Sequence, residues 1–147
     1  AGGLFVSAIL IAAIGDYLKK SERANRDRQR QSTVRYPKRS PFAAVRWQDS
    51  QPEVKLDDKW FKLVSLNELP VADIVAFSEQ TYEDQWQQRF EEDLIELLSR
   101  MGHPPADKVT LVVQSLKTSG TSVREDVPMT DENRSAIYDA NSKRSNR

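Results

Sequence analysis

The sequence contains no cysteine, a single histidine and only five glycines. The absence of cysteine excludes disulfide frameworks, thiolate zinc sites and cysteine nucleophiles. The sequence also has no G-x-S-x-G elbow, no P-loop and no G-x-G-x-x-G segment, so neither a hydrolase triad nor a nucleotide site has a motif to support it. Chemistry, if present, would have to come from residues that carry no such signature.

The polar residues that are present do not form a catalytic pattern. His103 follows the helix-ending Gly102, and a histidine in that position typically interacts with the last carbonyls of the helix. Glu92 and Glu96 lie one helical turn apart, but carboxylate metal sites in helical bundles also need Glu-x-x-His partners. We therefore interpret the acidic run at residues 91–96 as a solvated helix face and predict no catalytic, cofactor-binding or metal-binding residue. The chain is expected not to be an enzyme.

Charge is balanced overall but divided along the chain. Residues 19–39 carry nine Lys or Arg against two acidic residues, whereas residues 40–147 carry thirteen basic and nineteen acidic residues. The protein is therefore a basic neck joined to an acidic body. An acidic body argues against nucleic-acid binding, which needs a basic face. A basic neck beside an apolar segment is attracted to anionic lipid headgroups.

Residues 1–15 are almost wholly apolar and precede the basic neck. A helix of that length would be about 22 Å long, against a hydrocarbon core of about 30 Å. Extension of the helix through Leu18 and local thinning of the bilayer bring the helix length closer to the thickness of the hydrocarbon core. A cleaved signal would carry its charges before the apolar run rather than after it. A helix buried against another subunit is the alternative.

We predict a single-pass membrane anchor at residues 1–18, with the body on the cytoplasmic side because basic flanks stay there. The basic residues nearest to the anchor are expected to contact lipid headgroups: Lys19, Lys20, Arg23 and Arg26.

Beyond the anchor, the chain divides into a basic stalk and linker at residues 19–41, a folded domain at 42–129, and a polar C-terminal helix and tail at 130–147. Alternating segments predict strands at 42–48, 52–56, 59–66 and 108–116, and a weaker strand at 123–129. Between them, Val71, Ile74 and Val75 show helical spacing, and a longer apolar stripe follows. We predict two helices, or one long bent helix, ending at Gly102. The stripe consists of Tyr82, Trp86, Phe90, Leu94, Leu97, Leu98 and Met101.

The predicted fold class is α+β, a small antiparallel sheet of four or five strands packed by one main amphipathic helix. On residues 59–66, strict alternation would put Trp60 and Leu66 on one face and Leu63 on the other. Trp47, Trp60 and Trp86 are expected to be in the core because all three lie in periodic segments.

The order of these segments resembles the second half of a PDZ domain of the kind that accompanies bacterial envelope proteases. The similarity rests on "DDKWFKLVSLNELPV", "EEDLIELLSRMG" and "DKVTLVVQSLKTSGTSVREDVPM", and it covers about residues 57–129. The Gly-containing carboxylate loop of that family is not matched, because no glycine lies between Ser40 and Trp60. The resemblance implies a PDZ-like fold and assigns no peptide-binding residue.

Together these features favour a non-catalytic, membrane-tethered scaffold or adaptor that binds other protein subunits or peptide segments. Main-chain pairing at an exposed sheet edge would supply the affinity. Two alternatives stay open. One is an accessory subunit of a larger membrane complex, for which Gly2, Gly3, Ala12 and Gly15 would allow close helix approach. The other is a regulatory domain of a protease system.

Overall fold

The computed structural model describes residues 35–146, and the compact unit of the body begins at Tyr36. Its strands are β1 (Ala44–Gln48), β2 (Gln51–Leu56), β3 (Lys59–Leu66), β4 (Leu69–Pro70), β5 (Lys108–Ser115) and β6 (Thr121–Pro128). Its helices are α2 (Val71–Tyr82), the 3-10 turn η1 (Glu83–Gln85), α3 (Trp86–Glu92), α4 (Leu94–Arg100) and α5 (Asp131–Ser145). The α+β class is therefore confirmed.

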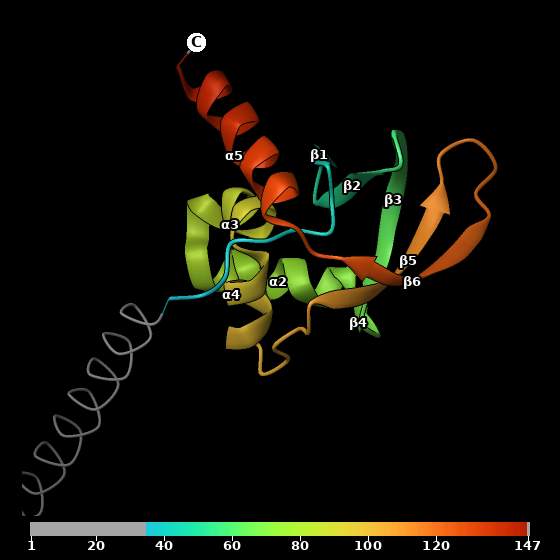
Figure 1. Ribbon diagram of the computed structural model, residues 1–147, viewed down its shortest axis with the longest axis horizontal. Helices are drawn as coiled ribbons and strands as arrows, with labels where there is room; N and C mark the ends of the chain where they lie inside the picture. Colours follow the sequence, from blue (N-terminus) through green and yellow to red (C-terminus); the bar gives the residue numbers. More distant parts are fainter. Residues whose placement is uncertain (1–34, 147) are drawn as a thin grey trace, which may run out of the picture. The chain divides into compact units, whose positions relative to one another are not determined.

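Within residues 35–146, all strand pairs are antiparallel, and the six-stranded sheet has the order β1-β2-β3-β5-β6, with the short β4 paired to β3. The helices α2, α3 and α4 come between β4 and β5 in the chain and pack together beside the sheet (Figure 1). A single hydrophobic core joins the two layers, with Val54, Leu63 and Leu111 of the sheet fully buried against Phe90 and Leu97 of the helices.

Two tight turns hold the sheet register with residues of positive φ. Asp57 and Asp58 have φ values of 49° and 64°, and Asn67 and Glu68 have values of 47° and 69°. Two consecutive left-handed residues are the requirement of the type I′ hairpin turn, whose twist matches that of the strands. Asn67 also fixes the turn to β5, because its main-chain N–H donates to the Thr110 carbonyl at 2.8 Å and its Oδ1 accepts from the Thr110 N–H at 2.9 Å.

The strict alternation predicted for residues 59–66 is wrong at the end of β3. Leu63 and Leu66 are both fully buried in the same core. A register irregularity between Leu63 and Ser65 inserts one extra residue, and a bulge of this kind turns the following side chain onto the other face. Trp60 is also not part of the core, since it is half-buried beneath the guanidinium of Arg46, 4.2 Å from the ring centroid. Trp47 and Trp86 do pack against the core.

The region for which we predicted two helices, or one long bent helix, forms the three helices α2, α3 and α4. The chain bends at Glu83, which has a φ of 52°, and again at Asp93, which has φ −126° and ψ 44°. Phe90, Leu94 and Leu97 share the buried stripe as predicted, at 0%, 1% and 0% exposure. Breaking the helix lets α3 and α4 turn their apolar faces toward one curved sheet.

The helix layer ends at Gly102, as the sequence predicts. Gly102 has a φ of 87°, a left-handed conformation that glycine adopts without the steric cost of a Cβ atom. The N–H of Gly102 donates to Ser99 at 3.0 Å and the N–H of His103 donates to Leu98 at 2.9 Å, the two hydrogen bonds of a Schellman cap. His103 thus contributes its main chain to the cap, while its side chain is exposed.

Residues 36–41, which we expected to be part of a linker, pack as a strap on the body. Ser40 is fully buried and exchanges two main-chain hydrogen bonds with Thr130, at 3.1 and 3.0 Å. Thr130 caps α5 as predicted, because its Oγ1 accepts from the N–H of Asn133 at 3.1 Å. The α5 helix packs on α3 and β1, with Ile137 only 3% exposed, so the C-terminal helix belongs to the compact unit.

The turn at Glu68 offers a direct test of this backbone. Replacing Glu68 with Gly is expected to raise the free energy of unfolding by about 1 kcal/mol, because glycine occupies the left-handed region without the steric cost that other residues incur. Asn-Gly is also the preferred pair for this turn. Urea unfolding of Glu68→Gly measures the gain, and Glu68→Val is the control that should destabilise. A Gly variant less stable than the parent would contradict the turn geometry.

Candidate functional site

The outer edge of β6 borders a groove. β6 is the last strand of the sheet, and the only bridge across the gap to the strap, among residues 35–146, is the Ser40–Thr130 pair. Between them lies a hollow of about 500 Å³, which we call the edge groove. It is lined on one side by Pro41, Ala43 and residues 55–57, and on the other by residues 123–128. The curved sheet therefore stops short of closing on itself, and the gap runs along β6.

The hydrogen-bond pattern shows which main-chain groups of β6 face this groove. The N–H of Ser115 donates to the Gly120 carbonyl at 2.9 Å at the closed end of the β5–β6 hairpin. From there, Thr121 pairs with Gln114, Ser122 with Val113 and Val123 with Val112. Because hydrogen-bonded and non-hydrogen-bonded pairs alternate in an antiparallel ladder, Ser122 bonds to β5 whereas Thr121 and Val123 direct their N–H and C=O groups outward.

Other features of β6 limit how far a partner strand could extend along it. The register between β5 and β6 shifts between Val109 and Leu111, and Asp126 has a φ of 54°. Pro128 has no main-chain N–H to donate. Bulges and prolines are the means by which natural sheets protect their edges. The regular, unprotected part of the edge is therefore residues 121–124, where Val123 is 58% exposed.

Arg124 stands at the centre of this region. Its guanidinium lies 5.1 Å from the Phe61 ring centroid, and its Nη1 is 3.5 Å from the Asp57 carboxylate. The contacts tie β6 to the β2–β3 hairpin across the groove. They also place a cation, held on an aromatic ring, beside the outward-facing main chain of Val123.

The acidic helix face predicted to be solvated is buried, so that interpretation is wrong. Glu91 and Glu92 are 6% and 4% exposed, because α5 covers this face of α3. Asn141 of α5 donates to Glu92 Oε2 at 2.9 Å, and the Nε of Arg134 donates to the Glu92 carbonyl at 3.0 Å. The acidic residues of α3 therefore hold the C-terminal helix in place.

Glu91 is the least satisfied of these carboxylates. Trp47 donates from its indole Nε1 to Oε2 at 3.1 Å, while Oε1 has no hydrogen-bond partner among the described residues and lies 3.7 Å from Arg144. Burial raises the pKa of the Glu91 carboxyl above its ordinary value, and the Trp47 hydrogen bond and the Arg144 charge oppose this effect only in part. Through these contacts Glu91 of α3 joins β1 and α5, so its role is structural.

The raised pKa of Glu91 predicts a pH effect on stability. An acid whose pKa is higher in the folded state binds its proton there first, so stability falls as pH rises from the ordinary value through the raised one. Glu91→Gln keeps an acceptor for Trp47 and removes the charge. The variant should therefore be the more stable protein at neutral pH, with the difference shrinking toward pH 4. Thermal unfolding of both proteins measures this difference across the pH range. A difference in unfolding temperature that did not change with pH would contradict the interpretation.

The predicted lipid contacts, Lys19, Lys20, Arg23 and Arg26, lie outside the described residues, as does the predicted anchor at residues 1–18. Within residues 35–146, no helix combines the length and the apolar character that crossing a bilayer requires. In the same part of the chain, no group of three or more His, Asp or Glu side chains is placed to hold a metal ion.

Sequence reasoning missed the residues that line the edge groove. Val123 and Arg124 were expected only as part of a weak strand, and neither was singled out. Part of the signal was present in the sequence, since Arg, Glu, Asp and Pro within one strand are typical of a sheet edge. What could not be deduced is the nearness of that edge to Asp57, which depends on the curvature of the whole sheet.

Comparison of the chain with protein-family models, with curated proteins and with solved structures gives no match.

Proposed function

We propose that this protein is a non-catalytic, membrane-tethered interaction module, a scaffold or adaptor that takes up an extended peptide segment of a partner protein along β6. Residues 1–18 would form the anchor, Lys19, Lys20, Arg23 and Arg26 would contact lipid headgroups, and the folded body would work in the cytoplasm. In this proposal the body is PDZ-like in its mode of binding, which uses strand addition to a sheet.

The observation that carries the proposal is the outer edge of β6, which pairs with no other strand of residues 35–146 and lies beside a groove. The outward N–H and C=O groups of Thr121 and Val123 can form main-chain hydrogen bonds with an added strand. The hollow of about 500 Å³ between β6 and the β2–β3 turn leaves room for side chains of the added strand. Main-chain pairing would give affinity, and the groove would select side chains at alternate positions.

The PDZ-like assignment is supported by the order of elements rather than by a binding loop. An antiparallel hairpin, a short strand, a helix layer and a closing hairpin follow one another from β2 to β6. The edge used here is nevertheless that of β6, and the glycine loop of the PDZ family has no counterpart in the sequence. The proposal therefore rests on the geometry of β6 and carries over no ligand-binding residue from that family.

A proline at position 123 tests the proposal. Val123→Pro removes one outward N–H and no hydrogen bond to β5, so the sheet should still form. We expect the variant to lose most of the partner that the full-length protein retains when it is isolated from detergent-solubilised membranes, because the added strand would lose a main-chain hydrogen bond and meet the proline ring.

The matched control is Val123→Thr, which keeps the N–H and a β-branched side chain of similar shape. It should retain the partner at the level of the parent. Circular dichroism and thermal unfolding of both variants establish that the body is folded. Equal recovery of the partner by a folded Pro variant and by the Thr variant would contradict strand addition at β6.

The accessory-subunit alternative predicts a different result in the same experiment. A subunit held in a complex through residues 1–18 would stay associated in both variants, and deletion of those residues would release it. An interaction module keeps its affinity for a peptide segment after that deletion.

A further inference from the structure

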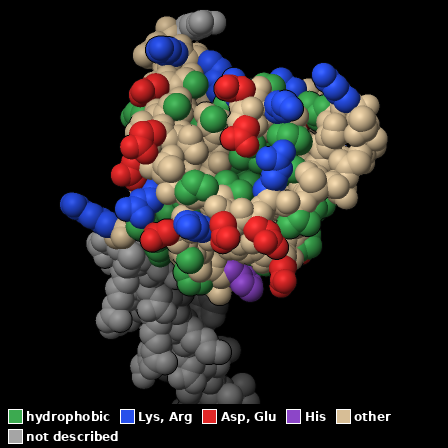
Figure 2. Space-filling view, turned by 45° about the vertical axis from the view of Figure 1, so that its right-hand side comes forward, with side chains coloured by type: hydrophobic (Ala, Val, Ile, Leu, Met, Phe, Trp, Pro, Cys, Tyr) green, Lys and Arg blue, Asp and Glu red, His purple; other side chains and the backbone are tan. Residues whose placement is uncertain are grey.

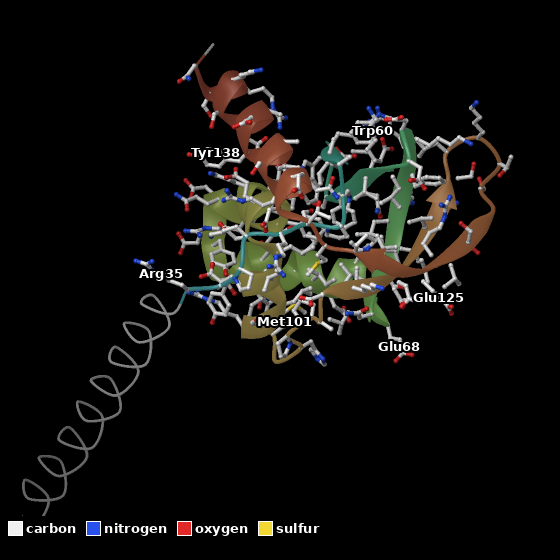
Figure 3. The ribbon with its side chains drawn as sticks, viewed as in Figure 1. Arg35, Trp60, Glu68, Met101, Glu125 and Tyr138 are labelled. Atoms are coloured by element: carbon white, nitrogen blue, oxygen red, sulfur yellow. The ribbon has the colours of Figure 1, made fainter. Side chains whose placement is uncertain are left out.

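A second hollow, of about 550 Å³, lies where β3 begins and β5 ends. Among residues 35–146, no acidic residue lines it and four basic residues from four segments do: Arg46, Lys59, Lys117 and Arg124. Trp60 and Phe61 supply aromatic rings between them. We call this hollow the cationic pocket. Figure 3 shows Trp60 near the start of β3 and Glu68 in the turn beyond the other end of that strand.

Two of the basic residues are held in fixed positions. The Arg46 guanidinium lies 4.2 Å from the Trp60 ring centroid, and its Nε donates to the buried Glu53 at 2.6 Å. The Arg124 guanidinium lies 5.1 Å from the Phe61 ring centroid and pairs with Asp57. Stacking on aromatic rings and single carboxylate contacts leave several N–H donors of each guanidinium free for a ligand.

The other two basic residues are not neutralised. Lys59 and Lys117 are exposed, and neither forms an ion pair within residues 35–146. Glu53 and Asp57 neutralise Arg46 and Arg124, so the pocket has a net charge of two positive charges from the lysines. The body from residue 40 onward has thirteen basic and nineteen acidic residues, so four cations around one hollow are a local reversal of its charge.

The cationic pocket adjoins the edge groove, because Arg124 lines both. We propose that the cationic pocket binds acidic side chains of the peptide segment that adds to β6. The inference rests on the proposed function and names the chemistry of its partner, an extended segment with Asp or Glu residues at one end. Arginine and lysine together suit carboxylates, with bidentate geometry from the first and point charge from the second.

A protein segment fits the pocket better than nucleic acid or membrane. One face of the Trp60 ring and one face of the Phe61 ring are already covered by guanidinium groups, so these faces do not offer free platforms for stacking bases. Figure 2 shows acidic and basic side chains interspersed on the face that it draws. Asp57, Glu125 and Asp126 line the adjoining edge groove, and these carboxylates would repel an anionic bilayer laid across both hollows. The cationic pocket is small enough to take only a few carboxylates, which suits the side chains of a peptide segment that pairs with β6.

The experiment uses the full-length protein in detergent and a fluorescent decapeptide of alternating Val and Thr that ends in two glutamates. A second decapeptide ends in two glutamines. We expect the glutamate peptide to bind roughly tenfold more tightly at low salt, equivalent to two modest ion pairs, and to lose this advantage at high salt. Lys59→Glu combined with Lys117→Glu should remove the preference for glutamate. Lys108→Glu is the matched control, since Lys108 is an exposed residue of β5 that does not line the pocket.

The outcomes separate this inference from the proposed function. Equal binding of the two peptides, sensitive to Val123→Pro, would overturn the acidic assignment and leave strand addition intact. An unchanged preference in the Lys59 and Lys117 double variant would place the acidic contact elsewhere and also overturn the inference. Stronger competition by phosphatidylserine vesicles than by free glutamate peptide would assign the pocket to lipid. Failure of both peptides to bind would contradict the two proposals together.

Discussion

Leu94→Ala is expected to lower the free energy of unfolding by about 3 kcal/mol. Leu94 is 1% exposed and lies at the start of α4, within the buried stripe that joins the helix layer to the sheet. Removing its side chain would leave a cavity beside Phe90 and Leu97, and neither neighbour can move far in a packed core. Chemical unfolding followed by circular dichroism measures the loss.

Leu116→Ala is the matched control for this prediction. It makes the same chemical change at a residue that is 45% exposed at the tip of the β5–β6 hairpin. The cost there should be within about 0.5 kcal/mol of zero, as for most surface substitutions. Similar losses for the two variants would mean that the stripe of α3 and α4 does not form the core described above.

Asp93→Ala is expected to be the most damaging change to a polar side chain, at about 2 kcal/mol. The Asp93 carboxylate is 9% exposed, accepts from Arg89 at 3.0 Å and from Lys38, and lies 3.9 Å from Arg134. These cations come from α3, the strap and α5. One carboxylate at the break between α3 and α4 therefore holds three segments together.

Asp93→Asn and Asp139→Ala serve as controls. The first keeps the shape of the side chain and should recover part of the loss, because its amide oxygen still accepts a hydrogen bond. The second removes an exposed aspartate of α5 and should leave the midpoint of unfolding unchanged. A stable Asp93→Ala protein would show that the strap and α5 are held by apolar contacts alone.

The strands and the core helix face were predictable because their signal is local. Alternation along β2 and β5, and apolar spacing of three and four between Phe90 and Leu97, reflect burial that each segment needs by itself. The cap at Gly102 and the cap at Thr130 were predicted for the same reason, since each depends on residues within one turn.

The acidic face of α3 was misinterpreted because its burial depends on a distant segment. Glu91 and Glu92 would be solvated on an isolated helix, and only α5, more than thirty residues later, covers them. A polar helix such as α5 also gives little sign that it packs, since Ile137 is its one buried apolar residue. Polar contacts between remote segments carry no periodicity by which a sequence could reveal them.

The candidate site was hidden for a related reason. Arg46, Lys59, Lys117 and Arg124 are unremarkable as separate charges, and the sheet order β1-β2-β3-β5-β6 brings them to one pocket. The bulge in β3, which buries both Leu63 and Leu66, contributes to the curvature that brings β6 toward the β2–β3 turn. Topology and curvature, rather than any motif, create the edge groove.

Amide hydrogen exchange of the full-length protein, with and without its partner, tests the central claim most directly. In the free protein the outward N–H groups of Thr121 and Val123 should exchange rapidly, while the N–H of Ser122 is protected by β5. Strand addition at β6 predicts that the partner slows exchange at Thr121 and Val123 and leaves Ser122 almost unchanged. A bound partner that protects other amides while Thr121 and Val123 continue to exchange rapidly would contradict it.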